Sequence, residues 1–141
     1  MDNKMKLTFL ARSENESFAR NAIAFFALQL NPSIAQITDI KTAVSEAVTN
    51  VIVHGYPSGE GEIIIETILN DNQIHINIFD TGVGIENISE ALEPFYTTKP
   101  EDERSGMGFT IMKSFMDTVV VESEKGKGTR IYMTKKLDND A

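Results

Sequence analysis

The spacing of apolar residues changes from a helical period to a strand period near the middle of the chain. Between residues 33 and 55, apolar side chains recur three and four positions apart, as they do along one face of a helix. Further on, Ile74, Ile76 and Ile78 alternate with polar residues, as they do in a strand that is buried on one face. The chain must therefore pack helices against a sheet.

The first 30 residues predict a short strand that feeds a helix. Residues 7–11 are β-prone, and Ser13 followed by Glu16 has the form of a capping box, which marks a helix start. The helix should end near Leu30, because a proline follows at position 32. Its predicted core stripe consists of Phe18, Ala22, Phe25, Phe26 and Leu30.

A second helix is predicted to begin between Ser33 and Thr38 and to end near Gly55. Its predicted apolar side consists of Ile40, Ala43, Val44, Ala47, Val48, Val51 and Ile52. The polar residues predicted to share the opposite side are Asp39, Thr42, Glu46, Thr49 and Asn50. Any chemistry carried by this helix is therefore expected on its polar side.

Two hairpins are predicted after the second helix. Strands are expected over residues 63–68 and 74–78, with the turn between them at residues 70–72. Residues 119–121 and 131–133 are expected to pair through the glycine-containing turn between them. The sheet therefore receives strands from both halves of the chain.

The segment between the hairpins is predicted to be largely irregular from Thr81 to Met107, apart from a short helix near residues 89–92. A helix follows from Phe109. Loops of this length are usually functional or disordered, and a lid loop is predicted over about residues 86–107. No repeat or linker divides the sequence, so residues 1–141 are predicted to form a single domain.

Composition narrows the class of protein. The absence of cysteine excludes a disulfide framework and thiolate chemistry, and two widely spaced histidines argue against a zinc site. A net charge of −8 argues against direct nucleic-acid binding and favours a protein partner. No apolar run approaches the roughly 20 residues that span a membrane, and the N-terminus lacks a secretory signal. The sequence therefore predicts a soluble cytoplasmic protein with no membrane partner.

Glu46 and Asn50 are the first candidate functional pair. They are four residues apart on the predicted helix, so their Cβ atoms should lie roughly 5 to 6 Å apart on one side. An asparagine oxygen is a suitable ligand for magnesium, and a carboxylate one turn away can deprotonate an attacking hydroxyl. The alternative is an ordinary polar helix face.

Asp80 closes a predicted strand and begins the second candidate segment. A partly buried carboxylate there needs a donor, and the exocyclic amine of adenine is one. Gly82 and Gly84 allow the backbone to turn tightly beside a flat base. Thr129 could offer its hydroxyl to the same base edge. The alternative is a capped turn after a strand.

The segment from Arg104 to Gly108 is a candidate phosphate loop. Gly106, Met107 and Gly108 precede the predicted helix, whose unpaired N–H groups suit a phosphate. The alternative is that this glycine-containing segment only begins a helix, as such segments commonly do. The long preceding loop, which contains Thr97, Thr98, Lys99 and Arg104, looks like a lid that can close over the phosphates and exclude water.

Taken together, these segments resemble the GHKL ATPase superfamily, which includes gyrase and the histidine kinases. Glu46 and Asn50 resemble its N box, and residues 80–84 and 104–108 its two glycine boxes. The resemblance implies an α+β fold, a two-layer sandwich of a mixed, mostly antiparallel sheet with helices on one face. It implies binding of ATP or ADP with Mg²⁺, in which Asn50 holds the metal and Asp80 binds adenine. It also implies that Glu46 is the general base. The implied nucleotide contacts also include Ser105 and Thr129.

Within the superfamily, the chain resembles bacterial anti-sigma factors that double as serine protein kinases, in their sporulation branch. This resemblance implies a homodimer that inhibits a sporulation sigma factor. It also implies phosphorylation of a serine on a STAS-type anti-anti-sigma protein, with Arg104 and Lys99 offsetting charge on the triphosphate. Arg20, opposite the core stripe of its helix, is a candidate contact for protein partners, and the alternative is a solvated arginine.

Two other functions remain open from the sequence. One is a small GHKL ATPase, or a histidine-kinase-like fragment, that hydrolyses ATP without a protein acceptor. The other is a sequestering protein that binds nucleotide only to fix its shape. Glu46 discriminates between them, because a nucleotide-gated binder has no use for a general base beside Asn50.

Overall fold

The computed structural model describes residues 2–55, 61–80, 103–124 and 128–137. Its strands are β1 (Asn3–Leu10), β2 (Glu62–Asn70), β3 (Gln73–Asp80), β4 (Thr118–Glu124) and β5 (Gly128–Lys136). Its helices are α1 (Glu14–Ala27), α2 (Ile34–Asn50) and α4 (Glu103–Phe115). A 3₁₀ turn (Leu28–Leu30) extends α1, and a π-helical turn (Val51–Gly55) extends α2.

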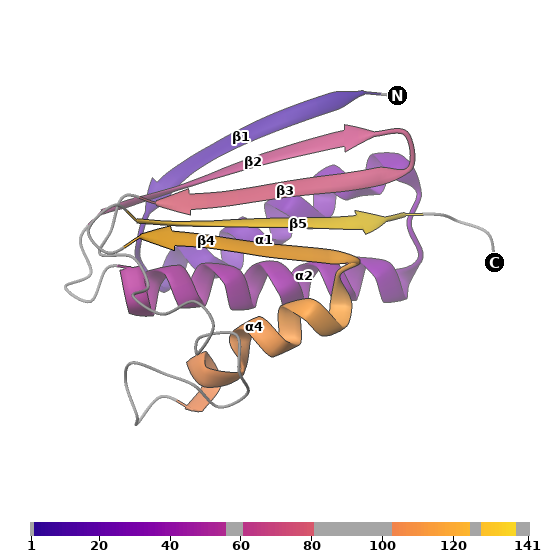
Figure 1. Cartoon of the computed structure of the whole chain (residues 1–141). Helices are drawn as coiled ribbons and strands as arrows, with labels where there is room; N and C mark the ends of the chain where they lie inside the picture. Colours follow the sequence, from indigo (N-terminus) through magenta and orange to yellow (C-terminus); the bar gives the residue numbers. More distant parts are fainter. Residues whose placement is uncertain (1, 56–60, 81–102, 125–127, 138–141) are drawn as a thin grey trace.

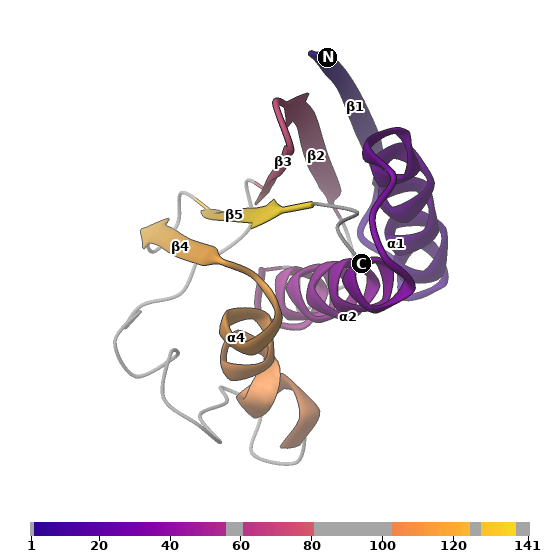
Figure 2. The same cartoon turned by 90° about the vertical axis from the view of Figure 1, so that its right-hand side faces the viewer.

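The strands form one sheet in the order β1-β2-β3-β5-β4, and every neighbouring pair is antiparallel. The helices cover one face of this sheet, as Figure 1 and the turned view in Figure 2 show. The predicted α+β two-layer sandwich is therefore confirmed. The described strands contain no parallel pair, so the sheet is antiparallel where a mixed one was expected.

The core lies between the helices and the inner face of the sheet. Alternate residues of β2 and β3 point inward, and Ile63, Ile65, Ile74, Ile76 and Ile78 are fully buried. The apolar side of α2 packs on them through Ile40, Ala43, Val44, Ala47 and Val48, as predicted. The alternation read from the sequence is thus the alternation of core and outer face.

The core stripe of α1 differs from the predicted one. The buried residues are Ala19, Ile23, Ala24 and Ala27, whereas Phe18 and Phe25 are 60% and 72% exposed. The apolar residues of this helix extend around most of its circumference, so spacing alone fits two faces. Small alanines let α1 approach the core closely, which the aromatic rings would prevent, and the prediction for Phe18 and Phe25 was wrong.

The predicted capping box at Ser13 is also wrong. Ser13 has helical dihedral angles and its side chain makes no capping bond, since its hydroxyl bonds Glu14 at 3.1 Å instead. The capping box belongs to α2, where the Ser33 hydroxyl accepts from the Gln36 N–H at 3.1 Å. In return, the Gln36 side chain accepts from the Ser33 N–H at 2.9 Å. Only Ser33 has the extended backbone that capping requires.

Replacing Ser33 with alanine should lower the free energy of unfolding by about 1 kcal/mol, because one N–H at the start of α2 loses its partner. Urea denaturation of the purified protein measures this change. Ser13→Ala is the matched control and should change stability by no more than a few tenths of a kcal/mol. Equal losses in the two variants would contradict the assignment of the cap.

The helix predicted from Phe109 begins earlier, at Glu103. An acidic residue in the first turn suits the positive end of a helix, and an isolated glycine costs only about 1 kcal/mol in a helix interior. Residues 103–107, which the sequence assigned to the lid, are therefore helical. The rest of the predicted lid and its short helix near residues 89–92 lie outside the described residues. Within the described part of the chain, no helix is long and apolar enough to cross a membrane.

Candidate functional site

The last two turns of α2 bring Glu46 and Asn50 to one region, and the two residues differ in burial. Glu46 is half-buried, whereas Asn50, which was predicted to share the polar side of α2, is only 2% exposed. The Asn50 Nδ2 group donates to the Glu46 carbonyl at 2.8 Å. This bond fixes the amide, so its oxygen points away from that carbonyl.

The Asn50 Oδ1 atom is the most informative atom in this region. It is buried and has no hydrogen-bond partner among the described residues. A buried acceptor without a partner typically costs about 1 to 3 kcal/mol. A hard cation would remove that cost, because amide oxygens are ligands of Mg²⁺. The position of Asn50 therefore fits the metal ligand that the sequence predicted.

No group of three or more histidine, aspartate or glutamate residues in the described segments could hold a metal ion. Mg²⁺ does not require one, because it usually binds through one or two protein ligands together with substrate phosphates and water. A single amide oxygen such as Asn50 Oδ1 is therefore compatible with a metal that arrives with a nucleotide.

Asp80 and Thr129 line a hollow at the end of the sheet. Asp80 ends β3 and is 7% exposed, and Thr129 lies near the start of β5, the strand that pairs with β3. The hollow measures about 320 Å³ and is lined by Phe79, Asp80, Glu122, Ser123, Gly128, Thr129 and Arg130. Asp80 and Thr129 were predicted to bind the same edge of adenine. The antiparallel pairing of β3 and β5 brings both residues to one hollow.

Ser123 is a lining residue that the sequence analysis missed. Its hydroxyl lies 2.8 Å from the Thr129 hydroxyl and donates to the Gly128 carbonyl at 3.1 Å. Ser123 faces Thr129 across the β4–β5 pair, so only the strand register reveals it. This contact orients the threonine hydroxyl inside the hollow.

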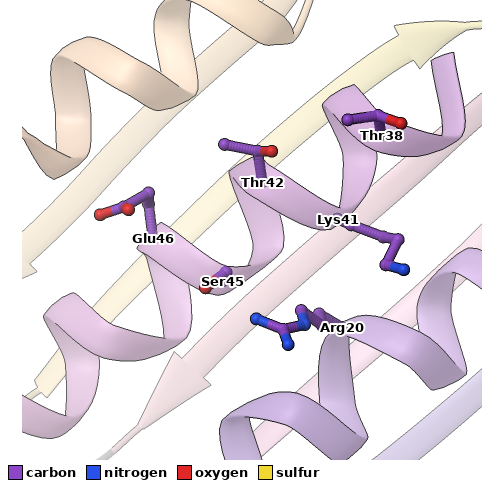
Figure 3. Close-up of a pocket in the computed structure, with 6 residues that line it drawn as sticks. All are labelled: Arg20, Thr38, Lys41, Thr42, Ser45 and Glu46. Atoms are coloured by element: carbon purple, nitrogen blue, oxygen red, sulfur yellow. The ribbon is translucent and has the colours of Figure 1, made fainter. Parts of the chain in front are cut away.

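Glu46 lines a different hollow, which lies between α1 and α2 (Figure 3). Its volume is about 350 Å³, and its lining consists of Arg20, Thr38, Lys41, Thr42, Ser45 and Glu46. Glu46 and Arg20 were predicted as functional residues from the sequence, whereas Lys41 and Ser45 were not. Helix periodicity places Lys41 and Ser45 on one side of α2, but only the packing of α1 turns that side into a hollow.

The remaining predicted site residues fall into two groups. Gly82, Gly84, Thr97, Thr98 and Lys99 lie outside the described residues. Arg104, Ser105, Gly106, Met107 and Gly108 lie in the first two turns of α4, which lies beside α2 in Figure 2. The prediction that these glycines precede the helix was wrong, because α4 already begins at Glu103.

The three parts of the predicted site therefore lie on α2, on the adjoining ends of β3 and β5, and on α4. Among the hollows lined by described residues, Glu46 and Asp80 line different ones. A single cavity shared by Glu46, Asn50, Asp80 and Gly108 would also involve residues 81–102, which are not described. The shared cavity stays a prediction.

The sequence matches a known family over most of its length. The profile of the histidine kinase-like ATPase domain matches residues 9–135. Anti-sigma F factors are among the curated relatives. That of Clostridium acetobutylicum is 57% identical over 137 residues, covering 97% of this chain and 96% of the relative. That of Clostridium perfringens is 59% identical over 139 residues, covering 98% and 99% respectively.

Solved structures share the fold at lower identity. A crystal structure of the RsbU and RsbW domains of a Mycobacterium tuberculosis protein superimposes with a TM-score of 0.72 at 19% identity. The match covers 99% of this chain and 34% of that one. A mycobacterial sensor histidine kinase gives a TM-score of 0.57 at 20% identity, with 72% of each chain covered. At these identities the likeness concerns the fold alone.

Proposed function

The chain belongs to the histidine kinase-like ATPase domain family, among the anti-sigma F factors, and from this premise we propose its activity. It binds and inhibits a sporulation sigma factor. With Mg²⁺ and ATP it also phosphorylates a serine on a STAS-type anti-anti-sigma protein. Membership of an ATPase domain family supports nucleotide binding, and the names of the relatives support the sigma factor as partner.

One observation carries the kinase part of the proposal. The buried Asn50 Oδ1 atom has no hydrogen-bond partner within the described segments, and Glu46 lies one helical turn before it on α2. A metal ligand and a carboxylate at this spacing can act on the two sides of one transferred phosphoryl group. A protein that bound nucleotide only to fix its shape would not need the carboxylate.

The predicted site residues divide the work of the reaction. Asn50 would hold Mg²⁺ through Oδ1, and Asp80 and Thr129 would bind the adenine edge in the hollow at the end of the sheet. Glu46 accepts the proton of the serine hydroxyl as the serine oxygen attacks the γ-phosphorus and ADP leaves. Mg-ATP supplies the phosphoryl group and the charge neutralisation that phosphoryl transfer requires. Arg104 and Lys99 add positive charge at the triphosphate.

The α1 helix is proposed to contact protein partners. Arg20 is half-exposed, and its guanidinium pairs with Glu16 at 3.3 Å, which holds it at the rim of the hollow beside α2. The acidic chain, with a net charge of −8, suits a partner that carries basic DNA-binding patches. The active form is proposed to be a cytoplasmic homodimer.

The direct test of this function is a transfer assay. The purified protein is incubated with γ-labelled ATP, Mg²⁺ and a STAS-type anti-anti-sigma protein, and phosphoserine is identified by mass spectrometry. Stoichiometric labelling of one serine is the expected result. Release of inorganic phosphate without labelled acceptor would instead identify a small ATPase, and nucleotide binding without turnover would identify a sequestering protein.

Replacing Asn50 with leucine should abolish the contribution of Mg²⁺ to nucleotide binding. In the unaltered protein, Mg²⁺ should strengthen binding of a non-hydrolysable ATP analogue at least about tenfold, because the metal links Asn50 to the phosphates. Calorimetry with Mg²⁺ and with EDTA should show no such difference in Asn50→Leu. The metal-free variant should melt no lower than the unaltered protein, because leucine removes a buried acceptor that lacks a partner in the part of the chain that the structure describes. A retained magnesium effect would contradict the assignment of Asn50.

A further inference from the structure

The residues that line the hollow between α1 and α2 all have polar or charged side chains. Those residues are Arg20, Thr38, Lys41, Thr42, Ser45 and Glu46. Figure 3 shows Lys41 and Arg20 on the side where the two helices face each other, with Glu46 further along α2. A volume of about 350 Å³ accommodates one or two amino-acid side chains. The hollow therefore offers a binding place for a polar group on the α1 side of the helix that carries the proposed general base.

Within the described segments, the charged residues around the hollow leave Lys41 without a paired counter-charge. Arg20 is already paired with Glu16, with 3.3 Å between Nη1 and Oε2. Asp39, the nearest acid before Lys41 on α2, pairs with Lys135 at 3.4 Å. Among the described residues, the Lys41 ammonium has neither an ion pair nor a hydrogen bond. In a chain with a net charge of −8, the Lys41 ammonium therefore provides a local site for a negatively charged group.

We propose that Lys41 and Ser45 bind a carboxylate side chain of the acceptor protein next to its phosphorylated serine. This inference rests on the proposed function, since it requires a protein acceptor whose serine reaches Glu46. Lys41 supplies the charge, and the Ser45 hydroxyl, four residues along the same side of α2, supplies a hydrogen-bond donor. The two residues select the acceptor and take no part in the chemical step.

The direction of phosphoryl transfer favours the acceptor over the nucleotide as the source of the carboxylate. Asn50 lies one turn beyond Glu46 toward the C-terminus of α2, whereas Lys41 lies more than one turn before it. In phosphoryl transfer the attacking and leaving oxygens are roughly in line on opposite sides of the phosphorus. If the metal and the nucleotide lie on the Asn50 side, the acceptor must approach from the Lys41 side.

The spacing along α2 limits where the carboxylate lies in the acceptor. Glu46 lies five positions after Lys41, which is about 7.5 Å along a helix axis and about 140° around it, so the two side chains lie further apart than the axial distance. An extended chain advances about 3.3 Å per residue. An aspartate or glutamate about two to four residues from the phosphorylated serine therefore reaches Lys41 while the serine reaches Glu46.

The test measures transfer kinetics of Lys41→Met with a STAS-type acceptor. We expect the KM for the acceptor to rise about tenfold, because a charge-assisted contact is lost, with kcat changed less than threefold. The affinity for a non-hydrolysable ATP analogue should not change. Lys6→Met, on the outer side of β1, is the matched control and should leave every constant unchanged. A thermal melt verifies that both variants are folded.

A scan of the acceptor identifies the partner of Lys41. Each aspartate and glutamate near the phosphorylated serine is changed to its amide, and transfer is measured with the unaltered chain and with Lys41→Met. One acceptor variant should raise the KM about tenfold with the unaltered chain and cause no further loss with Lys41→Met. Changing that acid to lysine should be rescued by Lys41→Glu.

The possible outcomes separate this inference from the proposed function. An unchanged acceptor KM in Lys41→Met would overturn the inference and leave the kinase proposal standing. Weaker binding of the ATP analogue by Lys41→Met would also overturn it, because the anion would then be a nucleotide phosphate. No transfer by the unaltered protein would overturn the proposed function and, with it, this inference.

Discussion

Glu46→Gln is expected to lower the rate of phosphoryl transfer to a STAS-type acceptor by about 10² to 10⁴ and to retain ATP binding. Glutamine keeps the shape of the half-buried side chain but cannot accept the proton of the serine hydroxyl. Single-turnover transfer of labelled phosphate measures the chemical step, and calorimetry with an ATP analogue measures binding separately. A loss confined to the chemical step identifies a general base.

The control for Glu46→Gln is Glu66→Gln. Glu66 lies on β2 with its side chain on the outer face of the sheet, opposite the face that the helices cover. The same loss of one negative charge there should leave the transfer rate unchanged. If Glu46→Gln phosphorylates the acceptor at the normal rate, Glu46 does not take the serine proton and another group must do so.

Asp80→Asn is expected to weaken nucleotide binding by about 1.5 to 3 kcal/mol, which corresponds to a 10- to 150-fold increase in Kd. Asp80 is 7% exposed and shares its hollow with Thr129, and we propose that its carboxylate accepts a hydrogen bond from the exocyclic amine of adenine. An asparagine can present an N–H group to that amine, which removes the acceptor and its charge. Calorimetry with ADP and with ATP measures the change.

The control for Asp80→Asn is Asp71→Asn, in the turn at the other end of β3. Asp71 has a positive φ of 55°, a conformation that asparagine also tolerates, so the exchange should not disturb the turn. Its effect on Kd should be negligible. Equal nucleotide affinity in Asp80→Asn and the unaltered protein would show that adenine is bound elsewhere.

Much of the fold could be predicted from the sequence where one periodicity dominates. Ile74, Ile76 and Ile78 alternate without exception, and all three are buried on the inner face of the sheet. From Ile40 onward the apolar residues of α2 lie on one side, so the predicted and observed core faces agree there. In such segments local spacing determines burial because only one face can enter the core.

The α1 helix and the start of α4 could not be predicted from local pattern. On α1, Phe18 and Ala19 are both apolar, and only close packing against the rest of the core decides that the alanine is buried. At α4, Gly106 and Gly108 suggest a loop, but the chain remains helical from Glu103. In both places tertiary context overrides a weak local preference.

The candidate site was partly predictable for a related reason. Asp80 could be chosen because it ends a regular strand, and Asn50 because it lies one turn from Glu46. The burial of Asn50 depends on how α2 packs in the fold, and the contact between Ser123 and Thr129 depends on the register of β4 and β5. Lys41 gains significance only because α1 lies beside α2.

A crystal structure with Mg²⁺ and a non-hydrolysable ATP analogue most directly tests the central claim, that α2 and the end of the sheet hold one magnesium-bound nucleotide. The predicted result is Mg²⁺ at about 2.1 Å from Asn50 Oδ1 and the adenine amine at about 3 Å from an Asp80 carboxylate oxygen. A nucleotide that touches neither Asn50 nor Asp80 would contradict the claim.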